Sequence, residues 1–351
     1  MRRGAMSAPS FLEGTMPLDP ETERGYWVAR KGVAVMDLSQ IGRLKMTGAD
    51  ALDLLHRLCT QDVKGLKVGE GAGAIITNEK GRVLDVINVY VFPDHLFLYT
   101  GAGNQAKTAA WLEKYTITED VQTTDVTGET ALVSFSGVKA RQLAVAIAGP
   151  ELEHLGRYQH RPADIGGPEA FITVGGPFGG GTSFSVVLRQ RKYVSKALDY
   201  LLTKGESLGA DLVGPRVHYV LRIEAGATMF GREIDERFNP LEAGMGHHVS
   251  FTKGCYIGQE VIARLDAYHK VQKHLVGLFL DDERPAHRED KLTRNGSGVG
   301  FITSTTYSPT LKKNIALGYV RTADAAPGTK LIAKTEAGER PVEITPLPFL
   351  L

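Results

Sequence analysis

The region beyond Tyr268 constrains the fold most, because short apolar segments alternate with turns there and no clear helical pattern intervenes. The segments with the pattern of strands are His274–Leu280, Gly298–Thr303, Ile315–Val320, Lys330–Lys334 and Pro341–Ile344. Five short strands separated by turns are typical of a small β-barrel. We therefore predict a C-terminal barrel domain over residues 275–351.

The preceding chain mixes strands with helices. Residues 33–48 alternate as a strand does, and a helical pattern follows in which Ala51, Leu55 and Cys59 lie on one face. Since free cysteine is among the most buried residue types, we expect Cys59 in the core. Asn78–Gly81 separates two apolar segments, and its glycine permits the positive φ of a tight turn, so a β-hairpin is expected there.

This mixture of elements continues to about residue 224. The pattern predicts strands at 131–135 and 183–188, a loop over the glycine-rich residues 163–182, and helices at 102–115, 139–147, 192–202 and 215–224. The predicted fold class is therefore α+β. Its domains are a discontinuous first portion within 1–160, a second portion over 161–274, and the barrel.

Composition excludes several classes of protein. Lysine plus arginine (41) and aspartate plus glutamate (40) leave a net charge of +1, so no nucleic-acid or membrane-surface partner is expected. No apolar run approaches the ~20 residues of a membrane span, and no signal-peptide core is visible. The two cysteines, Cys59 and Cys255, lack the spacing of a metal or cluster site, so a reducing cytoplasm fits best. Motifs of P-loop nucleotide-binding proteins, zinc proteases and serine hydrolases are absent.

Asp85 stands out in the strand that follows the predicted turn. Alternation places it on the same face as Val83, Ile87 and Val89. A carboxylate in an apolar row is costly unless it accepts hydrogen bonds. Two interpretations stay open: Asp85 caps neighbouring backbone groups, or it receives N–H donors from a ligand such as a heterocycle with amide and amine groups.

A second feature is the segment Lys253-Gly254-Cys255-Tyr256-Ile257-Gly258-Gln259-Glu260, which Arg264 follows. Glycines beside the cysteine allow close approach of the backbone, and the two basic residues favour a reactive thiolate at Cys255. The alternative is a packed thiol on a loop with solvated charges around it. No catalytic base is identifiable, so a cysteine-protease mechanism has little support.

Taken together, several segments resemble the folate-binding superfamily of the glycine-cleavage T-protein, a tetrahydrofolate-dependent aminomethyltransferase. They follow in the family's order from about residue 25 to the C-terminus. The segments are Val35–Ser39, Asn78–Gly81 with Asp85, Leu221–Gly226, Asn239–Gly244 and Ser308–Leu317. As a set they are highly specific.

Lys253–Glu260 indicates the branch within that superfamily. A T-protein usually has aspartate at the position of Cys255, whereas K-G-C-Y-x-G-Q-E resembles the YgfZ-like branch, which supports iron–sulfur cluster assembly or repair and affects tRNA modification. Two further departures from the T-protein agree with this. Its pair of adjacent aspartates is Asp85-Val86 here, and its T-G-E-D-G-[YF]-E stretch is replaced around Phe178–Ser185.

The resemblance implies a fold of two α+β domains and a barrel arranged as a ring around a folate funnel. Asp85 and Glu224 are then the expected folate contacts, and Arg222 supports them. Asp85 and Cys255 are the expected catalytic residues. For Glu224 the alternative is a structural ion pair with Arg222 or Arg232.

Three functional hypotheses follow. The first is an accessory protein that binds tetrahydrofolate, or a one-carbon-substituted form of it, and supports iron–sulfur proteins or their assembly machinery. The second is a tetrahydrofolate-dependent aminomethyltransferase, methyltransferase or demethylase in one-carbon metabolism. The third is a folate-binding module without turnover.

Overall fold

The computed structural model describes residues 18–167, 169–176, 183–281 and 286–350. The chain forms two compact units that interleave along the sequence. The barrel unit comprises the described residues up to 26, residues 214–245 and those from 262 onward. The two-sheet unit comprises 27–213 and 246–261. The three consecutive domains drawn from the sequence stay a prediction.

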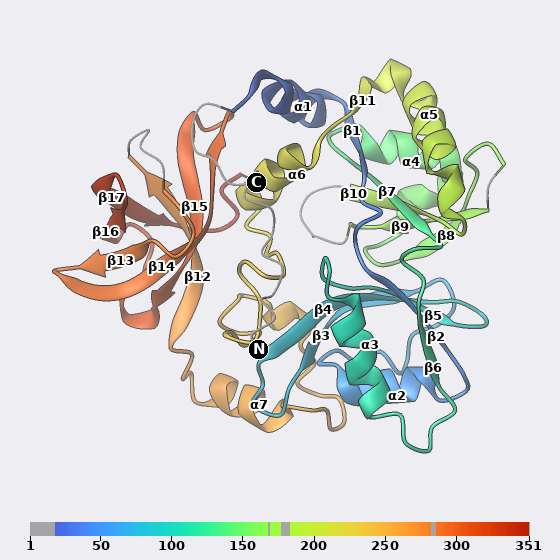
Figure 1. Cartoon of the computed structure of the whole chain (residues 1–351), viewed down its shortest axis with the longest axis horizontal. Helices are drawn as coiled ribbons and strands as arrows, with labels where there is room; N and C mark the ends of the chain where they lie inside the picture. Colours follow the sequence, from blue (N-terminus) through green and yellow to red (C-terminus); the bar gives the residue numbers. More distant parts are fainter. Residues whose placement is uncertain (1–17, 168, 177–182, 282–285, 351) are drawn as a thin grey trace. The chain divides into compact units, whose positions relative to one another are not determined.

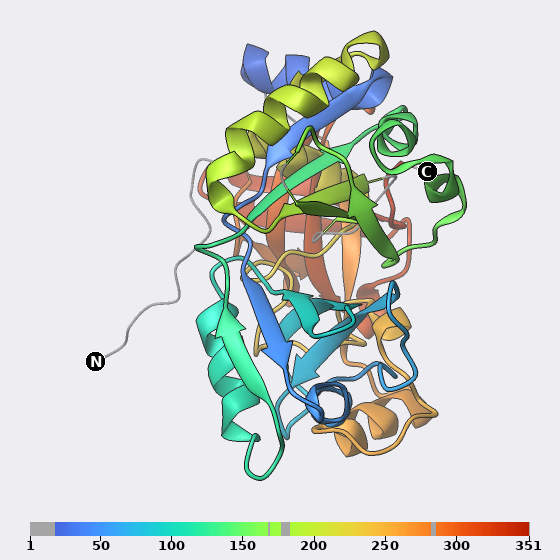
Figure 2. The ribbon, with the colours of Figure 1, turned by 90° about the vertical axis from the view of Figure 1, so that its right-hand side faces the viewer.

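One sheet of the two-sheet unit has the strand order β11-β1-β7-β10-β9-β8. Its strands are β1 (Val33–Asp37), β7 (Ala131–Ser136), β8 (His160–Ala163), β9 (Ala170–Val174), β10 (Ser183–Leu188) and β11 (Ala210–Leu212). Apolar residues of α4 (Ala140–Ala148) and α5 (Val194–Lys204) pack on one face of this sheet and form a core with it (Figure 2). The strands and helices expected over 131–202 are therefore confirmed.

The loop expected over residues 163–182 is wrong in part. Ala170–Val174 is a fully buried strand that pairs with β10 on one side and β8 on the other. The abundant glycines suggested a loop, but in the described region they flank this short apolar strand instead of interrupting it. The glycine cluster at 177–181 lies outside the described residues.

The second sheet has the strand order β3-β4-β5-β2-β6. Its strands are β2 (Arg43–Thr47), β3 (Gly71–Thr77), β4 (Val83–Val91), β5 (Leu96–Tyr99) and β6 (Gln122–Asp125). Apolar residues of α2 (Ala51–Leu58) and α3 (Gln105–Lys114) pack on one face, and the fully buried Cys59 belongs to that core (Figure 1). The predicted β3–β4 hairpin is confirmed, with Gly81 at φ +65° in its turn.

The single strand predicted over residues 33–48 is wrong. β1 and β2 belong to different sheets, and residues 38–42 between them are not extended. A Cβ at Gly42 would meet the side chains of Thr100 and Gln105, so this stretch passes close to neighbouring chain. The alternation of apolar residues therefore did not reveal that the chain passes from one sheet to the other between β1 and β2.

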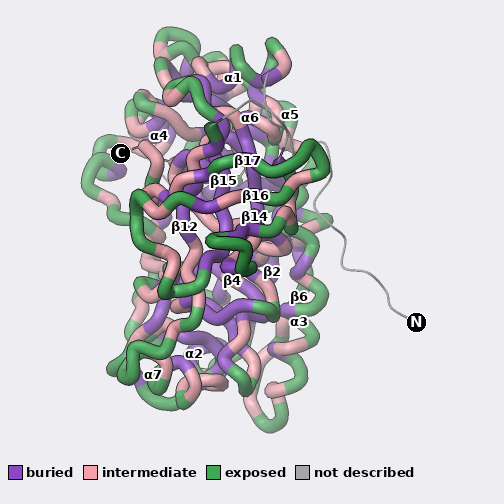
Figure 3. The backbone as a smooth tube through the Cα atoms, turned by 90° about the vertical axis from the view of Figure 1, so that its left-hand side faces the viewer, coloured by how far each residue is buried: buried purple, intermediate pink, exposed green. Residues whose placement is uncertain are grey.

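The barrel unit contains a closed barrel in the order β12-β15-β14-β13-β16-β17. Its strands are β12 (Lys273–Leu280), β13 (Lys291–Arg294), β14 (Ser297–Ser308), β15 (Lys313–Arg321), β16 (Lys330–Thr335) and β17 (Gly338–Thr345). Figure 3 shows buried positions along the barrel strands and exposed positions in their turns. The barrel is confirmed, although it has six strands and not five. The missed strand, β13, has only four residues and begins and ends with exposed basic side chains.

Three more helices complete the described elements that are relevant to function. α6 (Pro215–Glu224) begins and ends where the sequence predicts, with proline in its first turn, and it packs on β14 and β15. α1 spans Pro20–Lys31, and α7 spans Gln259–Ala267. Across the described residues, no helix is both long and apolar enough to cross a membrane.

Candidate functional site

Asp85 is buried in β4, with only 1% of its surface exposed. Its Oδ1 accepts hydrogen bonds from the backbone N–H of Val86 (2.8 Å) and of Gly101 (2.9 Å), and its Oδ2 accepts one from the Thr108 hydroxyl on α3. Burial raises the pKa of Asp85 to about 6, and these hydrogen bonds oppose the rise. The geometry therefore matches the interpretation in which Asp85 satisfies neighbouring protein donors.

The two faces of β4 carry different chemistry. Asp85 shares its face with Ile87 and Val89, which belong to the core beneath α2 and α3. Val86, Asn88 and Tyr90 alternate with them and face the opposite way. On that opposite face the Asn88 amide reaches the Gly176 carbonyl at 3.5 Å. The side chains of the adjacent residues 85 and 86 thus lie on opposite faces of one sheet.

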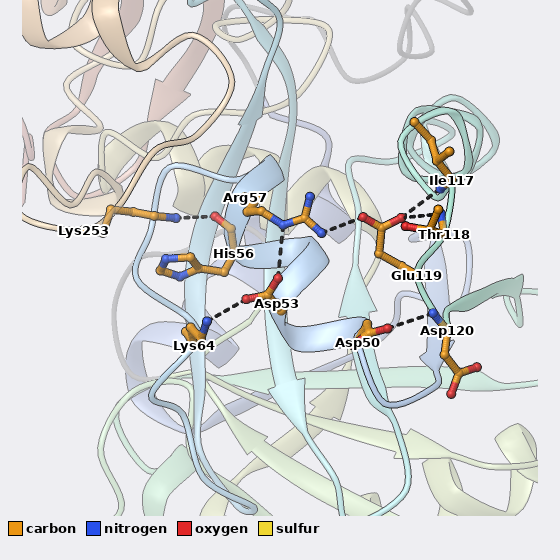
Figure 4. A network of polar contacts seen from close by, with 10 residues as sticks. All are labelled: Asp50, Asp53, His56, Arg57, Lys64, Ile117, Thr118, Glu119, Asp120 and Lys253. Carbon is orange, nitrogen blue, oxygen red and sulfur yellow. Dashed lines mark hydrogen bonds and ion pairs between the residues drawn. The ribbon is translucent and has the colours of Figure 1, made fainter.

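Lys253 caps the end of α2. Its Nζ donates to the carbonyls of His56, Cys59 (2.9 Å) and Gln61 (2.9 Å), and the first of these contacts is visible in Figure 4. Cations are favourable at helix C-termini, where carbonyls lack partners. Burial nevertheless lowers the pKa of Lys253. The ammonium group thus donates to carbonyls in the last turn of α2 and just after it, and Lys253 anchors the segment that it begins.

The same segment is anchored a second time on the β3–β4 hairpin. The Thr77 hydroxyl donates to the Ile257 carbonyl at 2.6 Å. Gly258 has φ +85°, and a Cβ there would lie 2.6 Å from the Asn78 carbonyl oxygen, so no other residue fits this contact. Between the two anchors, Gly254 and Cys255 are exposed. The protein therefore presents Cys255 on a loop held at both ends.

The remaining residues of this segment divide between core and surface. Tyr256 is buried, and burial raises its pKa to about 12. Gln259 and Glu260 open α7, and Arg264 is exposed on the same helix. The structure thus gives Lys253, Tyr256 and Gly258 packing roles, and it leaves Cys255 accessible.

Arg222 forms a buried ion pair in the barrel unit. One guanidinium nitrogen lies 3.0 Å from Glu233 Oε2, and both side chains are fully buried. The other terminal nitrogen donates to Ser304 Oγ at 2.6 Å, and Ser304 donates in turn to Glu233. This network ties α6 to β14. Removing one partner of such a pair leaves an uncompensated buried charge.

Glu224 is buried two residues further along α6. Its Oε1 accepts hydrogen bonds from the hydroxyls of Tyr26 (2.8 Å) and Ser308. Arg222 pairs with Glu233 and not with Glu224, and the alternative ion pair of Glu224 with Arg232 stays a prediction. Glu224 therefore joins α1, α6 and β14 within the barrel unit.

The sequence-predicted residues thus separate into two groups. Asp85 and Lys253–Glu260 lie in the two-sheet unit, where the latter packs on the hairpin that continues into the Asp85 strand. Arg222 and Glu224 lie in the barrel unit. Sequence reasoning missed the partners Thr108 and Glu233, for which no local pattern exists. It also passed over Asn88, which alternation could have marked as a polar residue in an apolar strand.

No cluster of three or more metal-ligating side chains suited to an ion occurs among the described histidine, cysteine, aspartate and glutamate residues. His247 and His248 are neighbours whose rings lie 4.2 Å apart.

Comparison with known proteins gives two matches that follow each other along the chain. Residues 3–253 match the GCVT N-terminal domain, and residues 273–350 match the glycine cleavage T-protein C-terminal barrel domain. The chain belongs to the glycine cleavage T-protein family. The predicted superfamily and its fold class, two α+β sheets followed by a barrel, are therefore confirmed.

Curated relatives of this T-protein family member are aminomethyltransferases. That of Thermotoga petrophila is 31% identical over 312 residues, which cover 86% of this chain and 84% of the relative. That of Rubrobacter xylanophilus is 32% identical over 323 residues, with 91% and 84% covered. Aminomethyltransferases of this family use tetrahydrofolate, as the resemblance implies.

A solved structure shares the fold. The glycine cleavage system aminomethyltransferase T from Bartonella henselae superposes with a TM-score of 0.83 at 24% identity, covering 96% of this chain and 91% of that one. None of the matched proteins named here carries the YgfZ name. The YgfZ-like branch, with its iron–sulfur and tRNA-modification roles, stays a prediction.

Proposed function

We propose that this chain is an enzyme that binds tetrahydrofolate and transfers a one-carbon unit to it, as an aminomethyltransferase or a related methyltransferase or demethylase. One observation carries the proposal. Both T-protein domains occur in order, and curated aminomethyltransferases about 30% identical align over more than four-fifths of their length. This ranks the second hypothesis from the sequence above the first.

The two faces of β4 have different parts in this proposal. When bound, tetrahydrofolate supplies the nitrogen that accepts the one-carbon unit. Asp85 already accepts three hydrogen bonds from the protein, so at most one of about four carboxylate lone-pair sites stays free for a ligand. In this proposal Asp85 is a positioning residue that fixes β4 to α3. The opposite face of β4, with Asn88, is available to hold the pterin.

This chain has valine at the second position of the aspartate pair that T-proteins usually carry. Adjacent residues in a strand face opposite ways, so a pair of aspartates would place one carboxylate on each face of β4. This chain keeps the carboxylate on the α3 face and has Val86 on the other. Polarisation of the accepting nitrogen then depends on neutral groups. The proposed reaction is therefore one-carbon transfer to tetrahydrofolate, and the turnover experiment below identifies the donor.

An accessory role for iron–sulfur proteins is the second candidate. The observation that favours it is the exposed thiol of Cys255 between the anchors at Lys253 and Gly258. Two cysteines, of which Cys59 is buried, cannot supply four thiolates to a cluster. Any cluster would need ligands from another molecule. Cys255 would then act in a transient contact or in a redox step with a partner thiol.

A turnover experiment separates the two candidates. The protein is incubated anaerobically with tetrahydrofolate and either an aminomethylated lipoyl carrier or a small methyl donor, and substituted folates are measured by mass spectrometry. Catalytic formation of a one-carbon-substituted folate supports the proposal. If neither donor reacts, and Cys255→Ser abolishes support of iron–sulfur enzymes in cells, the accessory role replaces it.

A further inference from the structure

The chain passes between the two sheets of the two-sheet unit at two places. The first crossing, residues 38–42, leads from β1 to β2, and the second crossing, residues 126–130, leads from β6 back to β7. They lie side by side, because the Val126 N–H donates to the Arg43 carbonyl at 3.0 Å and the Arg43 N–H donates to the Thr127 hydroxyl at 2.9 Å. A few residues at the ends of elements commonly absorb movements between parts of a fold. The two crossings together therefore form a hinge between the sheets.

Arg43, the first residue of β2, fastens the two crossings to each other. Its guanidinium is fully buried. On the first crossing its acceptors are the carbonyls of Ser39 (3.2 Å) and Ile41 (2.5 Å). On the second crossing they are the carbonyls of Thr127 (2.6 Å) and Thr130 (3.0 Å) and the Thr130 hydroxyl (2.7 Å). Carbonyls between strands lack the partners that a sheet provides, and a buried carbonyl needs a donor. One side chain thus satisfies both crossings at once.

The buried charge of Arg43 is held by neutral groups. Its five acceptors in the described chain are four carbonyls and one hydroxyl, and none is a carboxylate. Burial lowers the pKa of Arg43 to about 10, so the side chain stays charged at pH 7. A buried charge costs free energy that an apolar side chain of similar volume would avoid. What the guanidinium supplies in return is geometry, because its planar set of N–H groups has fixed directions.

Arg191 binds the same crossings from the other sheet. It follows β10, and its Nη1 lies 3.4 Å from the carbonyls of Ser39 and Thr127, which Arg43 also contacts. Its backbone N–H donates to the Glu129 carbonyl at 2.6 Å. The crossings are therefore fixed from β2 on one side and from the end of β10 on the other.

The hinge lies next to the region where the two sheets face each other. Tyr99 of β5 pairs in register with Arg43, and its hydroxyl lies 3.4 Å from the Thr173 hydroxyl of β9. Asn88 of β4 reaches the Gly176 carbonyl at 3.5 Å. Both distances are at the upper limit for a hydrogen bond, so these direct polar contacts hold the sheets weakly. The arrangement of the facing surfaces therefore depends on the hinge as well as on aromatic rings packed between the sheets.

From this geometry we infer that Arg43 is a positioning residue, which locks the hinge between the two sheets and so fixes the ligand-binding surface on the outer face of β4. The inference rests on the proposed function in taking the ligand to be tetrahydrofolate. Arg43 acts through the crossings, since its buried guanidinium is directed at their carbonyls.

The test compares Arg43→Met with Arg141→Met in the full chain. Arg141 of α4 is the matched control, because it also donates to two carbonyls, those of Leu152 (3.1 Å) and Glu153 (3.2 Å), but contacts neither crossing through them. Tetrahydrofolate affinity is measured by anaerobic calorimetry at a temperature at which urea denaturation shows every variant to be folded. It should fall about tenfold in Arg43→Met and equal that of the wild type in Arg141→Met.

Hydrogen–deuterium exchange gives a readout that a general loss of stability would not move. In Arg43→Met the backbone N–H groups of Ile41, Val126 and Thr130, which are bonded within or between the crossings, should exchange faster than the lower unfolding free energy accounts for. The N–H groups of β4 and β10 should change only as that free energy does.

The outcomes separate this inference from the proposed function. Wild-type affinity in Arg43→Met, unchanged exchange at its crossings, or an equal loss of affinity in Arg141→Met would each overturn the inference and leave the proposed function in place. Absence of tetrahydrofolate binding to folded wild-type protein would overturn the proposed function and, with it, the positioning role. If Arg43→Met does not fold, Thr130→Val decides, because it removes one acceptor of Arg43 and should lower the affinity by a smaller factor.

Discussion

Replacing Asp85 by asparagine should stabilise the protein relative to the wild type, and this gain should be larger at neutral pH than at acidic pH. Asparagine can keep the contacts: its Oδ1 accepts from the N–H groups of Val86 and Gly101, and its Nδ2 donates to the Thr108 hydroxyl. The substitution removes the titration and little else. It therefore isolates the cost of a buried negative charge.

The magnitude follows from the pKa of Asp85, which burial raises from 3.8 to about 6. The folded state binds this proton more tightly than the unfolded state, so the free energy of unfolding falls as pH rises through that window. The full loss, reached above the folded-state pKa, is about 3 kcal/mol. Between pH 5 and pH 7.5 the expected loss is about 1 kcal/mol.

Urea denaturation at pH 5, 6 and 7.5 measures this loss. The wild type should lose about 1 kcal/mol more than Asp85→Asn does between pH 5 and 7.5. Asp266→Asn on the exposed side of α7 is the control, and it should follow the wild type. Equal pH dependence of Asp85→Asn and wild type would refute the assignment of Asp85 as a buried, internally bonded carboxylate.

Three further predictions concern anchors and thiols. Lys253→Met should cost about 2–4 kcal/mol of unfolding free energy in urea, because three carbonyls at the end of α2 lose a charged donor; a loss below 0.5 kcal/mol would contradict the capping role. Arg222→Met should cost about 3–5 kcal/mol, and adding Glu233→Gln should restore part of it, as a double-mutant cycle would reveal. In native protein a chromogenic disulfide reagent should react rapidly with Cys255 and should react with Cys59 only on unfolding. Cys59 is fully buried, and burial raises its pKa to about 11. Rapid reaction of both thiols would contradict this packing.

Local signals in the sequence predicted the elements that depend on local chemistry. The turn at Asn78–Gly81 needs a glycine with positive φ, and Pro215 marks the first turn of α6, so both boundaries could be placed before the structure. The barrel followed from repeated short strands. β13 was missed because it has only four residues, of which the first and last are exposed and basic. β9 was missed because it is a short apolar run with glycines nearby, and neither strand is long enough to show a clear period.

Long-range partners could not be predicted in the same way. Alternation identified Asp85 as a carboxylate in an apolar row, but its partners Gly101 and Thr108 come from the next loop and helix. Lys253 was singled out beside a cysteine, whereas its ammonium caps a helix nearly two hundred residues earlier in the chain. Such contacts are set by packing of distant elements, for which a single sequence carries no periodic signal.

The most direct measurement for the central claim is anaerobic calorimetry of the folded protein with tetrahydrofolate. The account predicts saturable binding of one molecule per chain. Absence of binding to protein that unfolds cooperatively in urea would contradict the claim that this chain acts on tetrahydrofolate.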